Sequence, residues 1–401
     1  MSSMSFMEKL LDGYEVQWKT LGDIGDFIRG SGIQKSDFTE SGAGCIHYGQ
    51  IHTHYGTWAV KTKSFINPEF AERLRKANTG NLVIATTSED DAAVAKAVAW
   101  LGEEEVAVST DAYIYRHTID PKYMSYFFQT ELFQTQKKPH ITGIKVRRIS
   151  GDSLAKIKIP IPCPENPKRS LEIQAEIVRI LDAFSELAAE LAAELTARKR
   201  QYNYYRDQLL NFDERDVEWK TLGELAENLD SKRKPIRSGL RDVGNIPYYG
   251  ASGIVDYVKD YIFDGDFLLV SEDGANLLAR NTPIAFSVSG KSWVNNHAHV
   301  LKFETYAERR YVEYYLNSID LTPYISGSAQ PKLNQKNLNG IKIPNPLPEE
   351  KERIVAILDK FDALASSITE GLPREIALRQ QQYEHYRDLL LSFPEPEEMG
   401  A

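Results

Sequence analysis

Apolar residues follow a helical rhythm over residues 171–210. The seam positions alternate by four and three residues: Ile173, Ile177, Ile180, Phe184, Leu187 and Leu191, then Arg198, Tyr202, Tyr205 and Leu209. A 3.5-residue repeat is typical of the contact seam of a coiled coil. Alanine and glutamate, which favour helix, fill the remaining positions. The pattern predicts a helix of about 60 Å at about 1.5 Å per residue, if it is unbroken.

A second stretch near the C-terminus carries the same seam. Its apolar positions are Ile354, Ile357, Phe361, Leu364 and Ile368, and after a gap Ile376, Tyr383, Tyr386 and Leu390. Gly371-Leu-Pro373 interrupts the rhythm, and a new helical turn can begin with Pro373 near its first position. Two long helices with matching seams most simply pack on each other. Ordinary amphipathic helices that face separate cores are the other interpretation.

Between the helical stretches the pattern changes to short apolar runs. Residues 82–85 and 267–270 are expected to form buried strands, and residues 112–115 and 298–301 form a second matched pair. The aromatic segments at 123–129 and 311–317 are predicted helices. These segments therefore indicate a mixed α/β fold.

The chain is an internal duplication, because four motifs recur in the same order. Val16-Gln-Trp-Lys-Thr-Leu-Gly22 recurs as Val217-Glu-Trp-Lys-Thr-Leu-Gly223, and Ile157-Lys-Ile-Pro160 as Ile341-Lys-Ile-Pro344. Ile177-Val-Arg-Ile-Leu-Asp-Ala-Phe184 recurs as Ile354-Val-Ala-Ile-Leu-Asp-Lys-Phe361, and residues 202–212 recur as 383–393. A repeat of this length is a duplicated domain rather than a solenoid unit.

The duplication divides the chain into five parts. We expect lobe one at residues 1–164, a first helical spacer at 165–212, lobe two at 213–348, a second helical spacer at 349–393 and an acidic tail at 394–401. The repeated order of lobe and helix predicts that the two helices form an antiparallel coiled coil with a pseudo-two-fold axis. The predicted fold class is α/β, with two mixed α/β lobes alternating with two long helices.

Composition adds a local charge signal. The 401 residues carry a net charge of −9. This charge is a sum over the whole chain and does not exclude nucleic-acid binding, because binding needs only one basic face. Basic residues gather between Lys137 and Lys158 and between Lys232 and Arg241. No apolar run approaches the length of a membrane helix, no signal peptide is evident, and two cysteines make no disulfide framework. We expect a cytoplasmic protein.

Motifs for catalysis are missing or weak. The sequence has no Asn/Asp-Pro-Pro-Phe/Tyr motif of an adenine methyltransferase, and Gly290-Lys-Ser292 lacks the first glycine of a phosphate-binding loop. His47, His52 and His54, and likewise His297 and His299, have loosely metal-like spacing without a completing ligand, so no metal site is predicted. We expect that this chain is not an enzyme by itself.

With these features in place, the chain resembles the specificity (S) subunits of type I restriction–modification systems. The resemblance rests on residues 372–393 with their partner 198–212, on Ser271-Glu-Asp-Gly274 through residues 293–301, and on Gly327-Ser-Ala-Gln-Pro-Lys-Leu-Asn334 before Ile341-Lys-Ile-Pro344. Lobe one departs, because its counterpart, Gly143-Ile-Lys-Val-Arg-Arg-Ile-Ser150, lacks Ala-Gln-Pro.

The resemblance implies a mechanism. The lobes would be target-recognition domains, each reading one half of a split double-stranded DNA site, and the helices would set the gap. Two methyltransferase (M) subunits would dock on the helices, and two restriction (R) subunits would complete the enzyme. Cofactors are expected only in those partners, as S-adenosylmethionine, ATP and Mg²⁺.

Side-chain chemistry selects candidate contacts. Arg and Lys can pair with guanine, and Asn and Gln with adenine, in the major groove. For DNA we select Lys145, Arg147 and Arg148 in lobe one, and Gln330, Lys332, Asn334, Gln335 and Lys336 in lobe two. Tyr205, Arg206, Tyr386 and Arg387 on the repeated helix ends are either helix–helix core or the docking surface for M subunits.

Two alternatives remain open at this point. The chain would instead be a structural coiled-coil adaptor with two protein-binding lobes, or a specificity subunit of another class of restriction enzyme. Neutralising the basic loops separates DNA readers from an adaptor.

Overall fold

The computed structural model describes residues 6–11, 13–213, 217–327, 330–366 and 371–393. The chain forms two compact units. The first holds residues 1–190 and 376–401, and the second holds residues 191–375. The acidic tail expected at 394–401 lies outside the described residues. Among the described helices, none combines the length and apolar character needed to cross a membrane.

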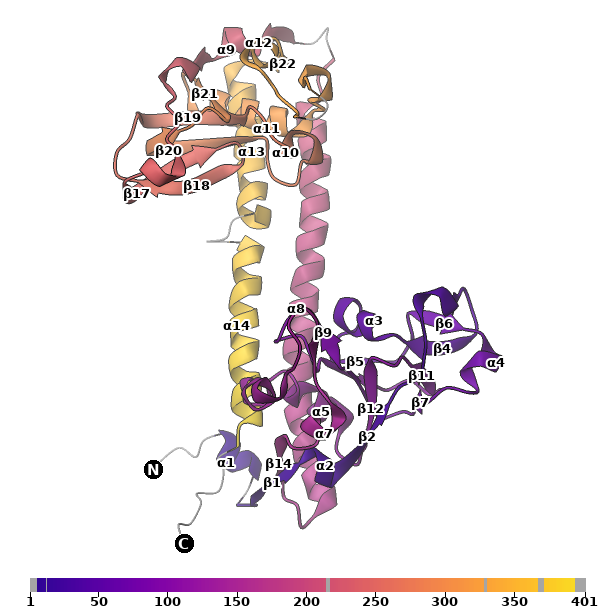
Figure 1. Cartoon of the computed structure of the whole chain (residues 1–401). Coiled ribbons are helices and arrows are strands. Elements are labelled where there is room, and N and C mark those ends of the chain that lie inside the picture. Colours follow the sequence, from indigo (N-terminus) through magenta and orange to yellow (C-terminus); the bar gives the residue numbers. More distant parts are fainter. Residues whose placement is uncertain (1–5, 12, 214–216, 328–329, 367–370, 394–401) are drawn as a thin grey trace, which may run out of the picture. The chain divides into compact units, whose positions relative to one another are not determined.

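Lobe one contains two five-stranded sheets (Figure 1). The first has the order β2 (Gly25–Arg29), β12 (Ala112–His117), β8 (Leu82–Ala85), β10 (Ala97–Trp100), β5 (Trp58–Ala59). The second has the order β3 (Phe38–Thr39), β6 (Ser64–Ile66), β4 (Ala43–Ile46), β11 (Val106–Val108), β7 (Lys76–Ala77). The strands predicted at 82–85 and 112–115 are confirmed. The second sheet was not predicted, because its strands are too short to show a period.

The described part of lobe one also contains short helices. They are α1 (Phe6–Leu11), α2 (Leu21–Ile24), α3 (Tyr48–Thr53), α4 (Pro68–Ala71), α5 (Pro121–Phe127), α6 (Glu131–Lys137) and α7 (Gly151–Leu154). The aromatic segment predicted to be helical is α5, which begins after the capping residue Asp120. Tyr123, Tyr126 and Phe127 are fully buried in the main core of the lobe. The helix is therefore held by burial of its aromatic rings rather than by propensity.

Lobe two has one six-stranded sheet. Its order is β16 (Glu227–Asn228), β21 (Ala298–Lys302), β19 (Phe263–Ser271), β20 (Ala285–Val294), β17 (Val243–Gly250), β18 (Gly253–Val258). Its helices are α9 (Leu222–Leu225), α10 (Asn276–Ala279), α11 (Tyr306–Ser318) and α12 (Gln335–Asn339). The strands predicted at 267–270 and 298–301 and the helix at 311–317 are confirmed within β19, β21 and α11.

Each lobe closes where its repeated motifs meet. In lobe one, β1 (Val16–Thr20) pairs antiparallel with β14 (Lys158–Pro162). In lobe two, β15 (Glu218–Thr221) pairs in the same way with β22 (Lys342–Asn345). The recurring entry motif and the Ile-Lys-Ile-Pro exit therefore form one two-stranded base beneath each variable segment.

The repeated helices are long. The first, α8, runs from Pro167 to Leu210 without a break, or about 66 Å. The second region contains two described helices, α13 (Pro348–Ser366) and α14 (Gly371–Leu391), and Gly371–Pro373, where an interruption was predicted, form the first turn of α14. Seam residue Ile368 lies outside the described residues.

The helices bury more than the predicted seam. In α13 the fully buried side chains include Ile354, Val355 and Leu358, which join the core of lobe two, whereas Ile357 and Phe361 are only half-buried. The equivalent Ile177, Val178 and Leu181 of α8 join the core of lobe one. Each helix therefore has one face on its lobe and a neighbouring face on another helix.

Within each unit two helical segments lie side by side and run in opposite directions (Figure 1). In the first unit, Phe184 of α8 stacks on Tyr386 of α14, with ring centroids 5.4 Å apart. In the second, Tyr205 of α8 stacks on Phe361 of α13, at 5.6 Å. The repeat makes Phe184 equivalent to Phe361 and Tyr386 equivalent to Tyr205. The same contact is thus made twice with the helices exchanged, and the antiparallel pairing is confirmed.

In each copy of the repeat, one aspartate of the long helix accepts hydrogen bonds from side chains of the lobe and so holds the lobe on the helix. Asp182 accepts hydrogen bonds from Tyr126 (2.8 Å) and Lys122 (2.7 Å) of lobe one. The equivalent Asp359 accepts from Tyr314 (2.6 Å), Arg310 (3.0 Å) and Tyr306 (2.7 Å). These bonds link the lobes to the helices through chemistry that both copies of the repeat retain.

We predict that Asp359→Ala lowers the free energy of unfolding of the second unit by about 3 kcal/mol, because it strips a buried arginine of one of its carboxylates. Arg310 is 14% exposed in its side chain. Asp182→Ala should cost less, since Lys122 is 22% exposed and loses only one partner. Urea denaturation of the full chain measures both, with exposed Lys360→Ala as control. Equal stability of Asp359→Ala and the control would contradict the fastening role.

Candidate nucleic-acid interface

Two hairpin loops occupy equivalent places in the lobes. Hairpin loop one (residues 142–148) is closed by reciprocal backbone hydrogen bonds between Thr142 and Arg148, at 2.9 and 2.8 Å. Hairpin loop two (residues 326–332) is closed by the same pair of bonds between Ser326 and Lys332, both at 2.8 Å. The two loops are therefore closed by the same backbone bonds although their sequences differ, and residues 328–329 of loop two lie outside the described residues.

A glycine begins each loop in a conformation that other residues avoid. Gly143 has a φ of +91° and Gly327 a φ of +81°. A Cβ on Gly143 would lie 2.1 Å from the carbonyl oxygen of Val146, and one on Gly327 would lie 2.6 Å from that of Gln330. Glycine is thus required by both the backbone angle and the space.

The residues that follow each loop return to the lobe in matching ways. The amide of Ile149 donates to the carbonyl of Thr86 (3.1 Å), and that of Leu333 donates to the carbonyl of Glu272 (2.8 Å). Ser150 then caps α7, and Asn334 caps α12 by accepting from the amide of Asn337. Both loops are therefore rigidly anchored at their ends, as a presenting surface requires.

The structure places most of the predicted DNA-contact residues on or just after these loops. Six of them are exposed: Lys145, Arg148, Gln330, Lys332, Gln335 and Lys336. Of these, Lys332 also pairs with Glu272 at 3.1 Å. Arg147 is half-buried and ion-paired with Asp91, with Nε 2.5 Å from Oδ1. The side-chain oxygen of Asn334 is occupied by its capping bond. Arg147 and Asn334 thus have roles in holding the lobes.

The basic stretch from Lys137 to Lys158 is not a single basic face. Lys137 is 1% exposed, and its ammonium donates to the carbonyls of Ala92 (2.8 Å) and Val94 (2.7 Å). Burial lowers the pKa of Lys137 to about 8. A count of charges along the sequence does not reveal this burial, and Lys137 is unavailable to a phosphate.

Four of the five histidines noted in the sequence have side-chain hydrogen-bond or ion-pair partners within their own lobe. His47 caps α3, and the Nε2 of His52 lies 3.0 Å from the carbonyl of Thr87. His297 pairs with Asp273 at 2.9 Å. His299 is different, because it lies fully buried with Asp230 and Glu272. No spacing in the sequence links Asp230 and Glu272 to His299, because the three residues come from distant segments.

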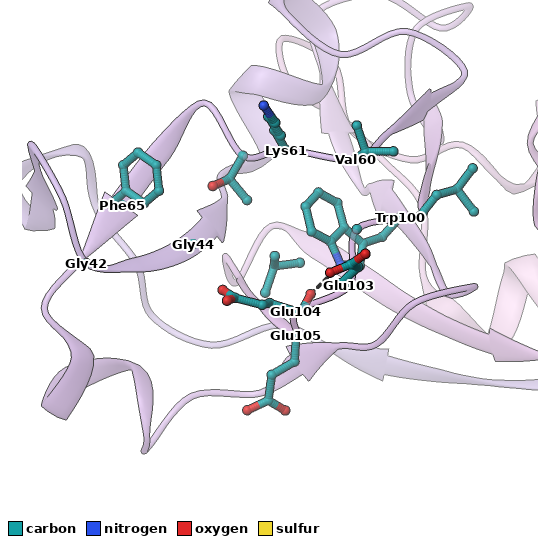
Figure 2. A pocket seen from close by; sticks show the side chains of 13 residues that line it. Gly42, Gly44, Val60, Lys61, Phe65, Trp100, Glu103, Glu104 and Glu105 are labelled. Carbon is teal, nitrogen blue, oxygen red and sulfur yellow. Dashed lines mark hydrogen bonds between the residues drawn. The ribbon is translucent and has the colours of Figure 1, made fainter.

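A hollow of about 550 Å³ opens on lobe one (Figure 2). Trp100 and Phe65 line it together with the consecutive exposed glutamates Glu103, Glu104 and Glu105. The indole of Trp100 donates to the carbonyl of Glu104 at 2.7 Å. An acidic rim repels phosphate, so this hollow is a poor place for the DNA backbone.

The four residues proposed for docking lie on the paired helices. Tyr205 and Tyr386 form the aromatic stacks described above, yet they keep 41% and 37% of their surface exposed. Arg206 and Arg387 are ion-paired with the adjacent Asp207 and Asp388. Each tyrosine thus contributes one ring face to the helix pair and leaves part of the ring accessible.

The geometry of two anchored loops on a duplicated frame agrees with comparisons to known proteins. The family described as the type I restriction modification DNA specificity domain matches residues 14–198 and, a second time, residues 214–378. The chain belongs to this family. The two matches correspond to the two copies of the internal repeat.

This specificity subunit has close relatives along its whole length. It is 37% identical over 436 aligned residues to the specificity subunit of the type I restriction enzyme EcoR124I/EcoR124II of Escherichia coli, with 99% of each chain covered. It is 33% identical to the EcoprrI specificity subunit of Escherichia coli, covering 92% of this chain and 93% of the relative. Neither the adaptor nor another class of restriction enzyme is favoured by these matches.

Solved structures share the fold. A chain from a study of complex assembly and conformational transition of the type I R-M system aligns with a TM-score of 0.63 and 16% identity, covering 94% of this specificity subunit and 97% of that chain. The S subunit from M. genitalium aligns with a TM-score of 0.56 and 15% identity, covering 98% and 100%.

Hairpin loop one gives a direct prediction for this specificity subunit. The double variant Lys145→Ala/Arg148→Ala should weaken binding to its DNA site at least tenfold, because a good base contact contributes about 1–3 kcal/mol. The salt dependence of binding should also become shallower, by about one unit per lost phosphate contact. Fluorescence anisotropy with a duplex carrying the site measures both. Lys199→Ala/Arg200→Ala on α8 removes the same charge and serves as control, and equal affinities of the two variants would rule out this loop as a contact.

Proposed function

We propose that this specificity subunit reads a split DNA site, with lobe one reading one half and lobe two the other. The observation that carries the proposal is the pair of hairpin loops, which are closed by the same backbone bonds, begin with an equivalent glycine and carry different side chains. Two lobes with equivalent loops and different loop side chains are suited to recognise two different DNA sequences.

Base chemistry differs between the two loops. Loop one offers the exposed Lys145, within the loop, and the exposed Arg148, at its closing pair, and both favour the guanine edge. Loop two and the start of α12 offer Gln330, Gln335 and Lys336, in which the amides favour adenine. Cations beside these residues would grip phosphates and set the register without reading sequence.

The paired helices suit the assembly role. We propose that two M subunits dock on the exposed parts of Tyr205 and Tyr386 and their neighbours, and that two R subunits join the M subunits. The repeated stacks support two equivalent docking places. S-adenosylmethionine, ATP and Mg²⁺ would be bound by those partners, and this chain would contribute specificity rather than catalysis.

The purified chain alone is expected to transfer no methyl group from S-adenosylmethionine to DNA, and addition of the cognate M subunit should restore transfer. The reason is that the chain carries none of the methyltransferase motifs sought in the sequence. Incorporation of a labelled methyl group into unmethylated DNA that carries the site is the measurement. Transfer by this chain in the absence of any partner would contradict a purely reading role.

A further inference from the structure

A buried ionic cluster lies in lobe two, made of Asp230, Arg233, Glu272 and His299. The Nδ1 of His299 is 2.5 Å from Asp230 Oδ2, and Arg233 Nη1 is 2.6 Å from Glu272 Oε2. The side chains are 12% exposed or less, and His299 is fully buried. Burial alone would raise the pKa of Asp230, but the hydrogen bond and charge of His299 hold it below its usual range.

Asp230, Glu272 and His299 have donor atoms close enough to suggest a metal site, yet the bonding accounts for their charge without one. Both ring nitrogens of His299 face acceptors, because Nε2 is 2.7 Å from the carbonyl oxygen of Leu333. Neither ring nitrogen is therefore left free to bind a metal. Arg233 pairs with both carboxylates, with Asp230 at 3.4 Å and with Glu272 at 2.6 Å, so the guanidinium supplies the positive charge that a metal ion would bring.

The cluster connects two basic segments that are far apart in the sequence. Glu272 holds Arg233 with one carboxylate oxygen and Lys332, in hairpin loop two, with the other at 3.1 Å. Its backbone carbonyl also accepts from Leu333, directly after that loop. One glutamate therefore fixes residues 230–233 and hairpin loop two on the same side of lobe two.

The segment after Arg233 presents further cations on a fixed backbone. Lys232, Lys234 and Arg237 are exposed. The carbonyl of Lys234 accepts from the indole of Trp293 (2.6 Å), and the amide of Ile236 donates to the hydroxyl of Tyr248 (2.9 Å). The backbone of this segment is already fixed by these hydrogen bonds. Its lysine and arginine side chains can therefore bind phosphates with a smaller loss of conformational entropy.

We propose that the Asp230–Arg233–Glu272–His299 cluster is a positioning device that joins residues 232–237 and residues 330–333, the end of hairpin loop two and the residue after it, into one DNA-binding surface, on which Lys232, Lys234 and Arg237 grip phosphates. The inference rests on the proposed DNA-reading function. It applies to lobe two alone, since the position equivalent to Glu272 is Thr86 in lobe one, where Arg147 and Asp91 form a separate pair.

Glu272→Gln tests the positioning role in the full-length chain. The probes are a duplex carrying the mapped split site and two duplexes in which one half or the other is scrambled. We expect at least a tenfold loss of affinity for the intact site, with discrimination lost for the lobe-two half and retained for the lobe-one half. Glu308→Gln is the matched control, because it takes a carboxylate from the buried Lys351 elsewhere in the second unit. Arg233→Lys, which keeps the charge but not the fork of donors, replaces Glu272→Gln if the latter does not fold.

The triple variant Lys232→Ala/Lys234→Ala/Arg237→Ala tests the phosphate grip. It changes exposed residues only, so the fold should persist. Affinity should fall equally on all three duplexes, and the slope of log affinity against log salt should become shallower by about three. An unchanged slope, or a folded Glu272→Gln chain with full discrimination of both halves, would overturn the proposal. If the wild-type chain binds none of the duplexes, the proposed DNA-reading function fails instead.

Discussion

A chain whose lobe two is replaced by a second copy of lobe one should direct methylation to a site in which both halves are the one that lobe one reads. In this chimera a copy of residues 16–160 replaces residues 217–344. Both junctions then lie at positions that the two halves of the chain share. The transplanted lobe brings Tyr123, whose hydroxyl bonds the carbonyl of Pro160, as Tyr311 bonds that of Pro344. It also brings Tyr126 and Lys122 for Asp359.

Methylome sequencing of cells that carry the chimera with its M subunit is the measurement. A foreign lobe from another specificity subunit, placed between the same joints, serves as a parallel case and should change one half of the motif only. The motif should change completely in that half, because several contacts of about 1–3 kcal/mol each are exchanged together. A chimera that methylates the original site would mean that lobe two does not read DNA.

Lengthening the helices should change the gap between the half-sites and leave both halves as they are. Four residues inserted after Leu191 add about 6 Å of helix, close to two base-pair steps of about 3.4 Å. Four residues also turn the helix about 40° beyond a full turn. A matching insertion is therefore needed between Ser366 and Gly371, where α13 ends and α14 begins.

The same methylome measurement reads the gap. Four exposed substitutions to alanine around Leu191 serve as control, since they alter the sequence without altering the length. A variant that reads different bases, rather than the same bases at a new separation, would contradict the role of the helices as a spacer.

The helical frame could be predicted because its signal is local and repeated. The seam at Ile177, Ile180 and Phe184 returns at Ile354, Ile357 and Phe361, and each copy makes the expected contact. The fully buried Leu181 and Leu358 were not predicted, because a seam for one partner helix says nothing of a second face on a lobe. The repeated Ile-Leu-Asp in both helices was a signal that could have identified Asp182 and Asp359.

The sequence predicted residues 143–150 to be the counterpart of residues 327–334, although Ala-Gln-Pro occurs in only one of them. Both segments begin with a positive-φ glycine inside a closed hairpin loop, which the sequence did not predict. Which side chains are available depends on partners distant in the sequence: Asp91 engages Arg147, and the carbonyls of Ala92 and Val94 engage Lys137. The cluster around Glu272 brings residues 230, 272, 299 and 332 together, and no spacing rule links them.

Mapping of methylated adenines in a host genome, with and without this chain beside its M subunit, tests the central claim most directly. The account predicts a motif that depends on the chain and has two short specified parts separated by unspecified bases of fixed number. A single uninterrupted motif, or a methylation pattern that does not change when the chain is removed, would contradict it.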